Sequence, residues 1–358
     1  MILISPIYII LLIALLLLST YHFNKRYVFI LIVFMLLLGV FRGVNVGTDH
    51  AGYEMDFMRF ITFDTARRYL FHQFEWGFLF LIKCFKLFSN DYALFSSLLF
   101  IPFWVGLMKF FKSTKVSIAS ALLLTYVFGF YFFGYSAMRQ ALAMSLILAS
   151  LPLLMRGKYV TFALITFVIS FLFHKSQILY ELLIPIHILV CKKKVVIRKK
   201  YLVIGLVISY LSFFVGQNLF KDSMNSIAVF LGLSDYSAYI MGMNGDKVSG
   251  NLTSTLFSLL ALLIIYFKKN LLCQFNFYVC ILGVYLYNIT SMMGTQSNRI
   301  SYCFFIFVTV ALPEIYEELK TNYRLFFKFS TITIGLIYFL KAFVINNVYA
   351  INPYYTLF

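Results

Sequence analysis

Residues 116–138, VSIASALLLTYVFGFYFFGYSAM, form a run of 23 residues without a charged side chain, closed by Lys115 and Arg139. About 20 apolar residues let an α-helix cross the hydrocarbon core of a bilayer. The run is continuous and lacks the alternation of an outer-membrane barrel strand. Because backbone polar groups inside a bilayer must be hydrogen-bonded internally, the run predicts a membrane-spanning helix.

The composition of the whole chain agrees with a membrane location. Of the 358 residues, 62% are hydrophobic and only 12% are charged. A soluble domain carries about 25% charged residues. The net charge of +17 does not come with a hydrophilic domain, so nucleic acid is not expected as a partner. The composition therefore excludes a soluble enzyme, a disordered tail and a DNA-binding domain.

The pattern of apolar runs predicts an all-α integral membrane protein with about twelve transmembrane helices. We expect a single polytopic membrane domain over residues 1–358. The predicted helices lie at about 2–20, 27–41, 92–110, 117–134, 138–155, 158–173, 176–190, 201–219, 252–267, 271–290, 299–315 and 328–345.

The distribution of Lys and Arg predicts the orientation of these helices. If both termini lie outside, the cytoplasmic loops contain 18 of the 30 basic residues and only three acidic ones, which gives +15 inside and +2 elsewhere. Two outer segments, at 42–91 and 220–251, are then long enough to form structure. The 13 residues from Trp76 to Phe88 carry two lysines, and we expect an interfacial or re-entrant helix there.

Arginines near the outer ends of spans are candidate ligands for an anionic substrate. Arg139, followed by Gln140, and Arg299, preceded by Asn298, each open a helix that runs inward, and Arg42 ends the second span. A helix N-terminus and a guanidinium together suit a phosphate. The structural alternative is an interfacial arginine whose side chain reaches the lipid headgroups.

Groups able to accept a proton lie at the same expected level. His174, followed closely by Ser176, is at the outer end of a span and suits a general base. The outer segment also carries polar and aromatic residues of the kinds that bind sugars: Asp49, Tyr53, Glu75 and Trp76. The five cysteines are scattered without metal-ligand spacing, so we expect no metal site.

These residues fall into motifs whose order resembles that of the EpsG-like family of bacterial, Wzy-type polysaccharide polymerases. From about residue 39 to the C-terminus, the motifs are Arg42 with Val46-Gly47-Thr48-Asp49 and Tyr53; Phe74-Glu75-Trp76-Gly77-Phe78; Met138-Arg139-Gln140-Ala141-Leu142-Ala143; Phe173-His174-Lys175-Ser176; Asn298-Arg299-Ile300; and Asn352-Pro353-Tyr354.

The resemblance implies a membrane-embedded glycosyltransferase, similar to the GT-C type, at the outer face of the bacterial plasma membrane. A growing glycan on undecaprenyl pyrophosphate would be transferred to a lipid-linked oligosaccharide repeat unit, without metal or cofactor. Arg139 and Arg299, with Arg42, are then expected to bind the pyrophosphate, and His174, Asp49 or Glu75 to deprotonate the acceptor. Further candidate partners are membrane lipids, a chain-length regulator and a flippase.

Three other functions remain open from the sequence. A lipid-linked oligosaccharide flippase would place polar groups through the midplane and show inverted repeats, whereas here they gather at the outer ends of spans. An O-antigen ligase would share the donor site. A membrane O-acyltransferase would also use a lone histidine, but the inner loops show no acyl-CoA site.

Overall fold

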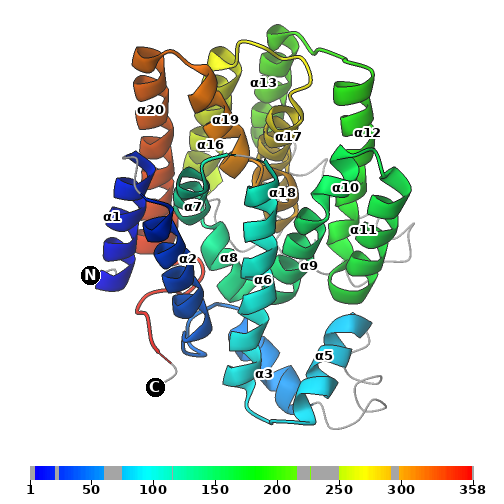
Figure 1. Cartoon of the computed structure of the whole chain (residues 1–358), viewed down its shortest axis with the longest axis vertical. Helices are drawn as coiled ribbons and strands as arrows, with labels where there is room; N and C mark the ends of the chain where they lie inside the picture. Colours follow the sequence, from blue (N-terminus) through cyan, green and yellow to red (C-terminus); the bar gives the residue numbers. More distant parts are fainter. Residues whose placement is uncertain are drawn as a thin grey trace. The chain divides into compact units, whose positions relative to one another are not determined.

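The described part of the chain is built of helices. The structure is a computed structural model that describes residues 5–20, 24–59, 75–114, 116–215, 226, 250–291 and 298–356. Within these ranges the only β-type pairing is an isolated antiparallel bridge between Arg42 and Thr356. The predicted all-α class is thus confirmed (Figure 1). Most of the expected outer loop at 220–251 lies outside the described residues.

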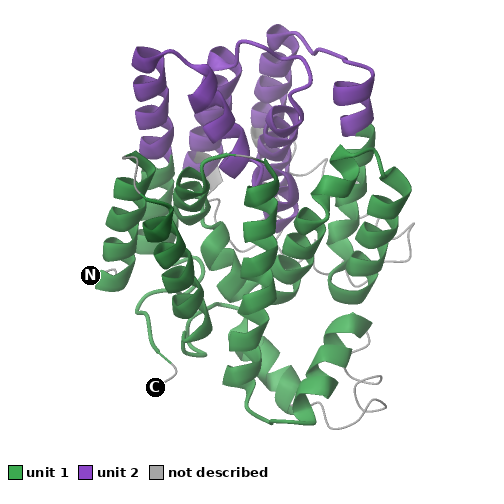
Figure 2. Ribbon diagram, in the orientation of Figure 1, with its two compact units in different colours: residues 1–185, 335–358 green, residues 186–334 purple. Residues whose placement is uncertain are grey.

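The chain divides into two compact units, which we describe separately (Figure 2). Unit 1 comprises residues 1–185 and 335–358, and unit 2 comprises residues 186–334. Helices of unit 1 are α1 (Pro6–Thr20), α2 (Lys25–Val40), α3 (His50–Arg59), α5 (Trp76–Lys86), α6 (Tyr92–Thr114), α7 (Ile118–Val127), α8 (Phe130–Ser136), α9 (Met138–Ala149), α10 (Leu151–Met155), α11 (Tyr159–Phe173), η1 (Lys175–Leu182) and η4 (Leu340–Ile345). Helices of unit 2 are η2 (Ile188–Lys192), α13 (Lys199–Val215), α16 (Gly250–Phe267), α17 (Phe275–Thr290), α18 (Asn298–Phe305) and α19 (Val308–Glu318), while α12 (Leu183–His187) and α20 (Thr321–Phe339) contribute to both units.

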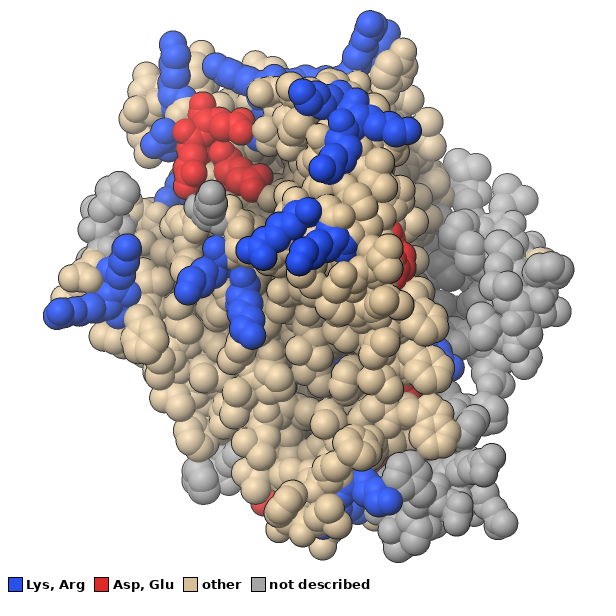
Figure 3. Space-filling view, turned by 45° about the vertical axis from the view of Figure 1, so that its right-hand side comes forward, with Lys and Arg blue, Asp and Glu red and all other residues tan. Residues whose placement is uncertain are grey.

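Each of the twelve predicted spans overlaps at least one of these helices. Within the described residues, four helical segments are long and apolar enough to cross a membrane: Tyr92–Thr114, Met138–Met155, Asn298–Glu318 and Thr321–Ile345. The number is five if the bent pair α7–α8 is one span. Shorter apolar helices accompany them, and most of the surface drawn in Figure 3 carries neither sign of charge. The chain is a multi-pass membrane protein, and the full number of twelve crossings stays a prediction.

The uncharged run at 116–138, which the sequence predicted to hold one span, is bent. Helices α7 and α8 meet at an angle of 57°. Gly129 separates them with a φ of 81°, a left-handed conformation that only glycine adopts at little cost. A Cβ atom here would also lie 2.2 Å from the ring of Phe343. The break therefore requires glycine both for backbone conformation and for space.

The helices of unit 1 have a basic end and an opposite end that carries the predicted site residues. Helix α2 begins at Lys25 and runs toward Arg42, and helix α11 begins at Tyr159, directly after Lys158, and runs toward His174. Helices α6 and α9–α10 run the other way, toward Lys112 and Arg156 respectively. Because α6 packs on both α2 and α9, and α9 packs on α11, these ends gather on two opposite sides of the unit.

Close packing of α6 against α9 fixes the helix that carries Arg139. A Cβ atom added to Gly106 of α6 would lie 2.7 Å from the carbonyl oxygen of Ser145 on α9. Small residues at such contacts let membrane helices approach backbone to backbone. The axial position of α9 therefore depends on the absence of a side chain at residue 106.

Gly106→Ala should lower the thermal unfolding midpoint of the detergent-solubilised protein, because an overpacked interface costs about 1–3 kcal/mol. Gly52→Ala is the matched control, since a Cβ atom added to Gly52 on α3 meets nothing within 4 Å. Equal midpoints for the two variants would contradict the close α6–α9 contact.

Candidate functional site

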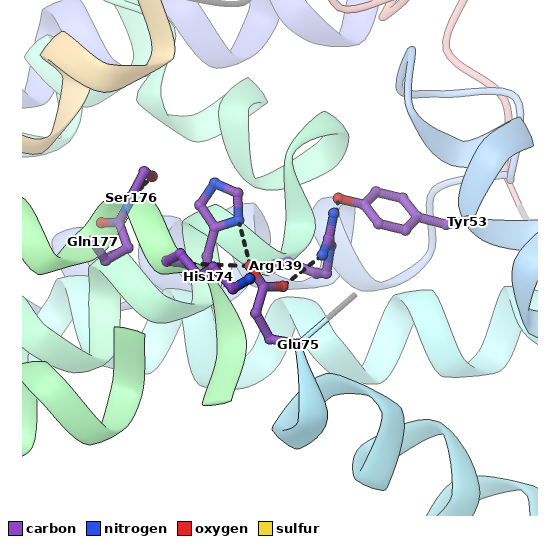
Figure 4. A network of polar contacts seen from close by, with 7 residues as sticks. Tyr53, Glu75, Arg139, His174, Ser176 and Gln177 are labelled. Atoms are coloured by element: carbon purple, nitrogen blue, oxygen red, sulfur yellow. Dashed lines mark hydrogen bonds and ion pairs between the residues drawn. The ribbon is translucent and has the colours of Figure 1, made fainter. Parts of the chain in front are cut away.

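Four of the predicted site residues meet at one end of unit 1, although they come from four different segments (Figure 4). Tyr53 is on α3, and Glu75 is the residue before α5. Arg139 is in the first turn of α9, and His174 follows the last residue of α11. The sequence separations are large, so only the folded chain brings these side chains together.

An ion pair between Glu75 and Arg139 lies at the centre of this cluster. The Arg139 guanidinium donates to Glu75 Oε2 at 2.6 Å. The side chains of Arg139 and Glu75 are only 14% and 8% exposed. The Nε of Arg139 donates to the Tyr53 hydroxyl at 3.4 Å. The guanidinium also lies over the rings of Tyr53 and Phe78. The arginine is thus held by one carboxylate and two aromatic faces.

The second carboxylate oxygen of Glu75 faces the turn after α11. The backbone N–H of Lys175 donates to Glu75 Oε1 at 3.1 Å. His174 Nδ1 lies 3.5 Å from the same oxygen, beyond the usual range of an N–H···O hydrogen bond. In Figure 4 the carboxylate lies between Arg139 and His174, with the dashed contacts fanning out from it. Glu75 therefore links α5 to the ends of both α9 and α11.

These contacts determine the ionisation of Glu75. Burial by itself raises the pKa of the carboxyl group, whereas the contacts with His174, Arg139 and the Lys175 N–H lower it, and the net pKa lies below its ordinary value. Hydrogen bonds to the charged form and a nearby cation both favour ionisation. Glu75 is consequently a carboxylate at neutral pH, and a weaker base than an ordinary glutamate.

Local sequence explains why the segments can approach so closely. A Cβ atom added to Gly77, in the first turn of α5, would lie 2.6 Å from the carbonyl oxygen and the Cβ atom of Leu172. The glycine thus lets α5 rest directly on the last turn of α11. His174 has an extended backbone, with φ −165° and ψ 108°, which ends α11 and starts η1. The close approach at Gly77 and the end of α11 at His174 together place Glu75 beside His174.

A second, fully buried cluster surrounds Arg42. Its guanidinium donates to the Ser96 carbonyl and to His50 Nε2, each at 3.4 Å, and lies over the rings of Phe100 and Tyr135. Only 1% of the residue is exposed. Arg42 also donates a hydrogen bond to the Gly39 carbonyl near the C-terminus of α2. A positive charge at this end interacts favourably with the helix dipole. The contacts of Arg42 fasten α2 to α3 and α6.

His50 is a member of this cluster that the sequence did not single out. Since an arginine can only donate, Nε2 must be the acceptor, and Nδ1 carries the proton that faces the Tyr92 hydroxyl at 2.8 Å. Burial and the adjacent Arg42 lower the pKa of His50 to about 3. His50 is therefore a neutral structural imidazole. The only sequence signal for it was its position in the polar segment after the second predicted span.

The remaining predicted residues occupy different surroundings. Gln140 is buried on α9, Trp76 is 42% exposed at the start of α5, and Ser176 accepts a hydrogen bond from the Gln177 amide on η1. Asp49 accepts from the Thr48 hydroxyl at 3.1 Å, just before α3. Arg299 and Asn298 begin α18 in unit 2, so their proposed roles rest on the sequence.

The Glu75–Arg139 pair predicts an acid-sensitive contribution to stability. The folded-state pKa of Glu75 lies below the unfolded value of about 4.5, so its ionisation stabilises the fold above that pH and loses this effect as the pH falls through the folded pKa. Glu75→Gln leaves Arg139 buried without its carboxylate and should cost about 3–5 kcal/mol at neutral pH. The thermal midpoints of variant and parent should converge in acid.

Glu54→Gln, on α3, is the matched control because it removes a carboxylate outside the pair. A constant difference between the Glu75→Gln variant and the parent protein at every pH would show that the ion pair does not stabilise the fold.

Comparison with known proteins places the chain in a family. No curated protein and no solved structure matches the chain. The model of the EpsG family, in contrast, matches residues 25–356, which include every candidate site residue described above. The chain therefore belongs to the EpsG family, which is associated with exopolysaccharide biosynthesis.

Proposed function

We propose that the protein is a polysaccharide polymerase, a glycosyltransferase that elongates a lipid-linked glycan. Its donor is a growing glycan on undecaprenyl pyrophosphate, and its acceptor is a lipid-linked oligosaccharide repeat unit. Family membership and the membrane-embedded helices are consistent with lipid-linked substrates. The observation that carries the proposal is the meeting of Arg139, Glu75 and His174 at one end of unit 1.

The location of this cluster suits chemistry at the outer face of the plasma membrane. The opposite end of unit 1 carries the basic residues of α2 and α6, and Arg156 and Lys158 between α10 and α11. Basic loops favour the cytoplasmic side. The end with Arg139 and His174 is then exposed to the outer leaflet, where the lipid-linked substrates are used.

Arg139 is proposed to bind the donor pyrophosphate. It lies in the first turn of α9, where the free N–H groups and the helix dipole add to its positive charge. Negative charge develops on the pyrophosphate as the bond to the anomeric carbon breaks. A fixed cation at that point lowers the energy of the transition state. Glu75 and the ring of Tyr53 hold the guanidinium in place before substrate arrives.

His174 is the best-placed base for the acceptor hydroxyl. With Nδ1 directed to Glu75, its Nε2 is on the opposite side of the ring and can accept a proton. A carboxylate behind a histidine fixes the ring and stabilises the imidazolium that forms. Glu75 itself is ionised by its contacts, and its lowered pKa makes it a poor base. The 3.5 Å contact is expected to shorten when substrate binds.

The proposed reaction has a simple balance. The acceptor oxygen forms a bond to the anomeric carbon of the donor while the bond from that carbon to the pyrophosphate oxygen breaks. The hydroxyl proton moves to His174 Nε2 and is later released to solvent. Polyprenyl pyrophosphate leaves, and the glycan is longer by one repeat unit.

Arg139→Lys should abolish long polymer and leave single repeat units on the lipid carrier, because lysine keeps the charge beside Glu75 but loses the planar fork that binds phosphate oxygens. Loss of one such donor lowers turnover by about 100-fold. Glycan length on a gel, at matched protein levels, measures this. Arg156→Lys at the basic end of unit 1 is the control, and normal chain lengths in Arg139→Lys would refute the assignment.

His174→Ala should lower kcat by about 100-fold or more while changing the KM for the donor little, since a general base acts only in the chemical step. Lys175→Ala is the matched control, because the contact of residue 175 with Glu75 uses its backbone N–H. The two constants can be measured with purified protein and synthetic lipid-linked oligosaccharide. A variant with an unchanged kcat would exclude His174 as the base.

A further inference from the structure

Helix α5 and the residue after it, Leu87, expose a stripe of side chains on the face opposite the one packed into the described part of unit 1. Trp76, Phe80 and Leu87 are 42%, 57% and 76% exposed, and Lys83 between them is exposed as well. The spacings of four, three and four residues place all four on one side of a helix. We call Trp76, Phe80, Lys83 and Leu87 the α5 stripe.

The opposite face of α5 is packed into unit 1. Phe78, Leu79 and Ile82 are each less than 5% exposed and join a core with Phe95 and Met138. Gly77 presses against the last turn of α11. The helix is thus held firmly on one side, and the exposure of large apolar side chains on the other is a property of the packed structure.

The exposed side chains of the neighbouring helix α11 indicate where the hydrocarbon layer of the membrane lies. Val160, Leu164, Phe167 and Phe171 are 73%, 60%, 58% and 54% exposed and follow the same spacing of four, three and four residues. In a multi-pass membrane protein such a stripe faces lipid. The last residue of this stripe, Phe171, is next to Leu172, the residue that Gly77 of α5 contacts. Helix α5 therefore begins where the hydrocarbon layer along α11 ends.

We propose that the α5 stripe lies in the bilayer interface on the side of the candidate site, with Lys83 against the phosphates of anionic phospholipids. A tryptophan, two apolar side chains and a lysine on one face form the combination that binds a membrane surface. The stripe starts at the residue after Glu75, so this contact holds the Glu75–Arg139 pair at the depth of lipid headgroups. The proposal concerns the resting membrane contact and does not depend on the proposed function.

Lys86 offers an internal comparison on the same helix. Its ammonium group lies 4.7 Å from the centre of the Phe57 ring, and it belongs to no part of the α5 stripe. Lys83 is the more exposed of the two residues. Because Lys83 belongs to the α5 stripe and Lys86 does not, only Lys83 is expected to contact headgroups.

The chain contains two tryptophans, which makes the proposal directly measurable. Trp104 is 1% exposed and donates to the Ile32 carbonyl at 3.2 Å. In Trp104→Phe, Trp76 is the sole tryptophan. Trp104→Tyr, which keeps a polar hydrogen, serves if the first variant does not fold. The full-length variant is placed in phosphatidylglycerol vesicles, with Trp76→Phe as the control for the signal of Trp104.

Lipids brominated near the headgroup should quench Trp76 emission more than lipids brominated deep in the acyl chain, and aqueous iodide should quench it little. Stronger quenching by the deep bromines would place α5 inside the hydrocarbon and overturn the proposal. Quenching by iodide without any effect of brominated lipid would place the α5 stripe in water and overturn it equally.

The role of Lys83 is tested in the same single-tryptophan protein. Replacing phosphatidylcholine with phosphatidylglycerol should increase the loss of Trp76 emission caused by the shallow bromines. Lys83→Gln should remove this dependence on anionic lipid, whereas Lys86→Gln should retain it. Identical behaviour of the two variants would refute the contact of Lys83 with headgroups.

Discussion

The ion pair between Glu75 and Arg139 is the contact on which the candidate site depends. A guanidinium that is 14% exposed at the end of a membrane helix is costly without a counter-ion. Glu75 supplies that charge and uses its second oxygen for Lys175 and His174. One carboxylate therefore fixes the ends of α5, α9 and α11 relative to one another. Any substrate that reaches Arg139 meets a cation whose position is already set.

Arg42 and Arg139, two of the arginines of unit 1, show how surroundings separate similar residues. Arg42 and Arg139 both lie at helix ends, and Arg42 contacts Met138, the residue before Arg139. Arg42 is buried among carbonyl groups, a neutral His50 and aromatic rings, where it fastens helices together. Arg139 keeps partial exposure beside His174. Burial thus favours a structural role for the first and a substrate-binding role for the second.

Several features were predictable because they depend on residue type and spacing alone. Apolar runs indicated the positions of most helices, although α3 was not predicted, and polar residues at or after their ends indicated Tyr53, Glu75, Arg139 and His174. The bend at Gly129 was missed, since a glycine in an apolar run is also tolerated in a straight helix. His50 was missed because its role depends on packing against Arg42 and on Tyr92, which is 42 residues away in the sequence.

The sequence by itself determined that this is a helical membrane protein of the EpsG family, with its basic residues concentrated in particular loops. Hydrophobicity and charge act residue by residue, so they can be read without a fold. Only the tertiary structure decided that Glu75 pairs with Arg139, that the same carboxylate faces His174, and that Trp76 and Lys83 share the exposed face of α5. These relations join residues 64 and 99 (174 − 75) positions apart or depend on which helix face is packed, and close packing at Gly77 and Gly106 sets them.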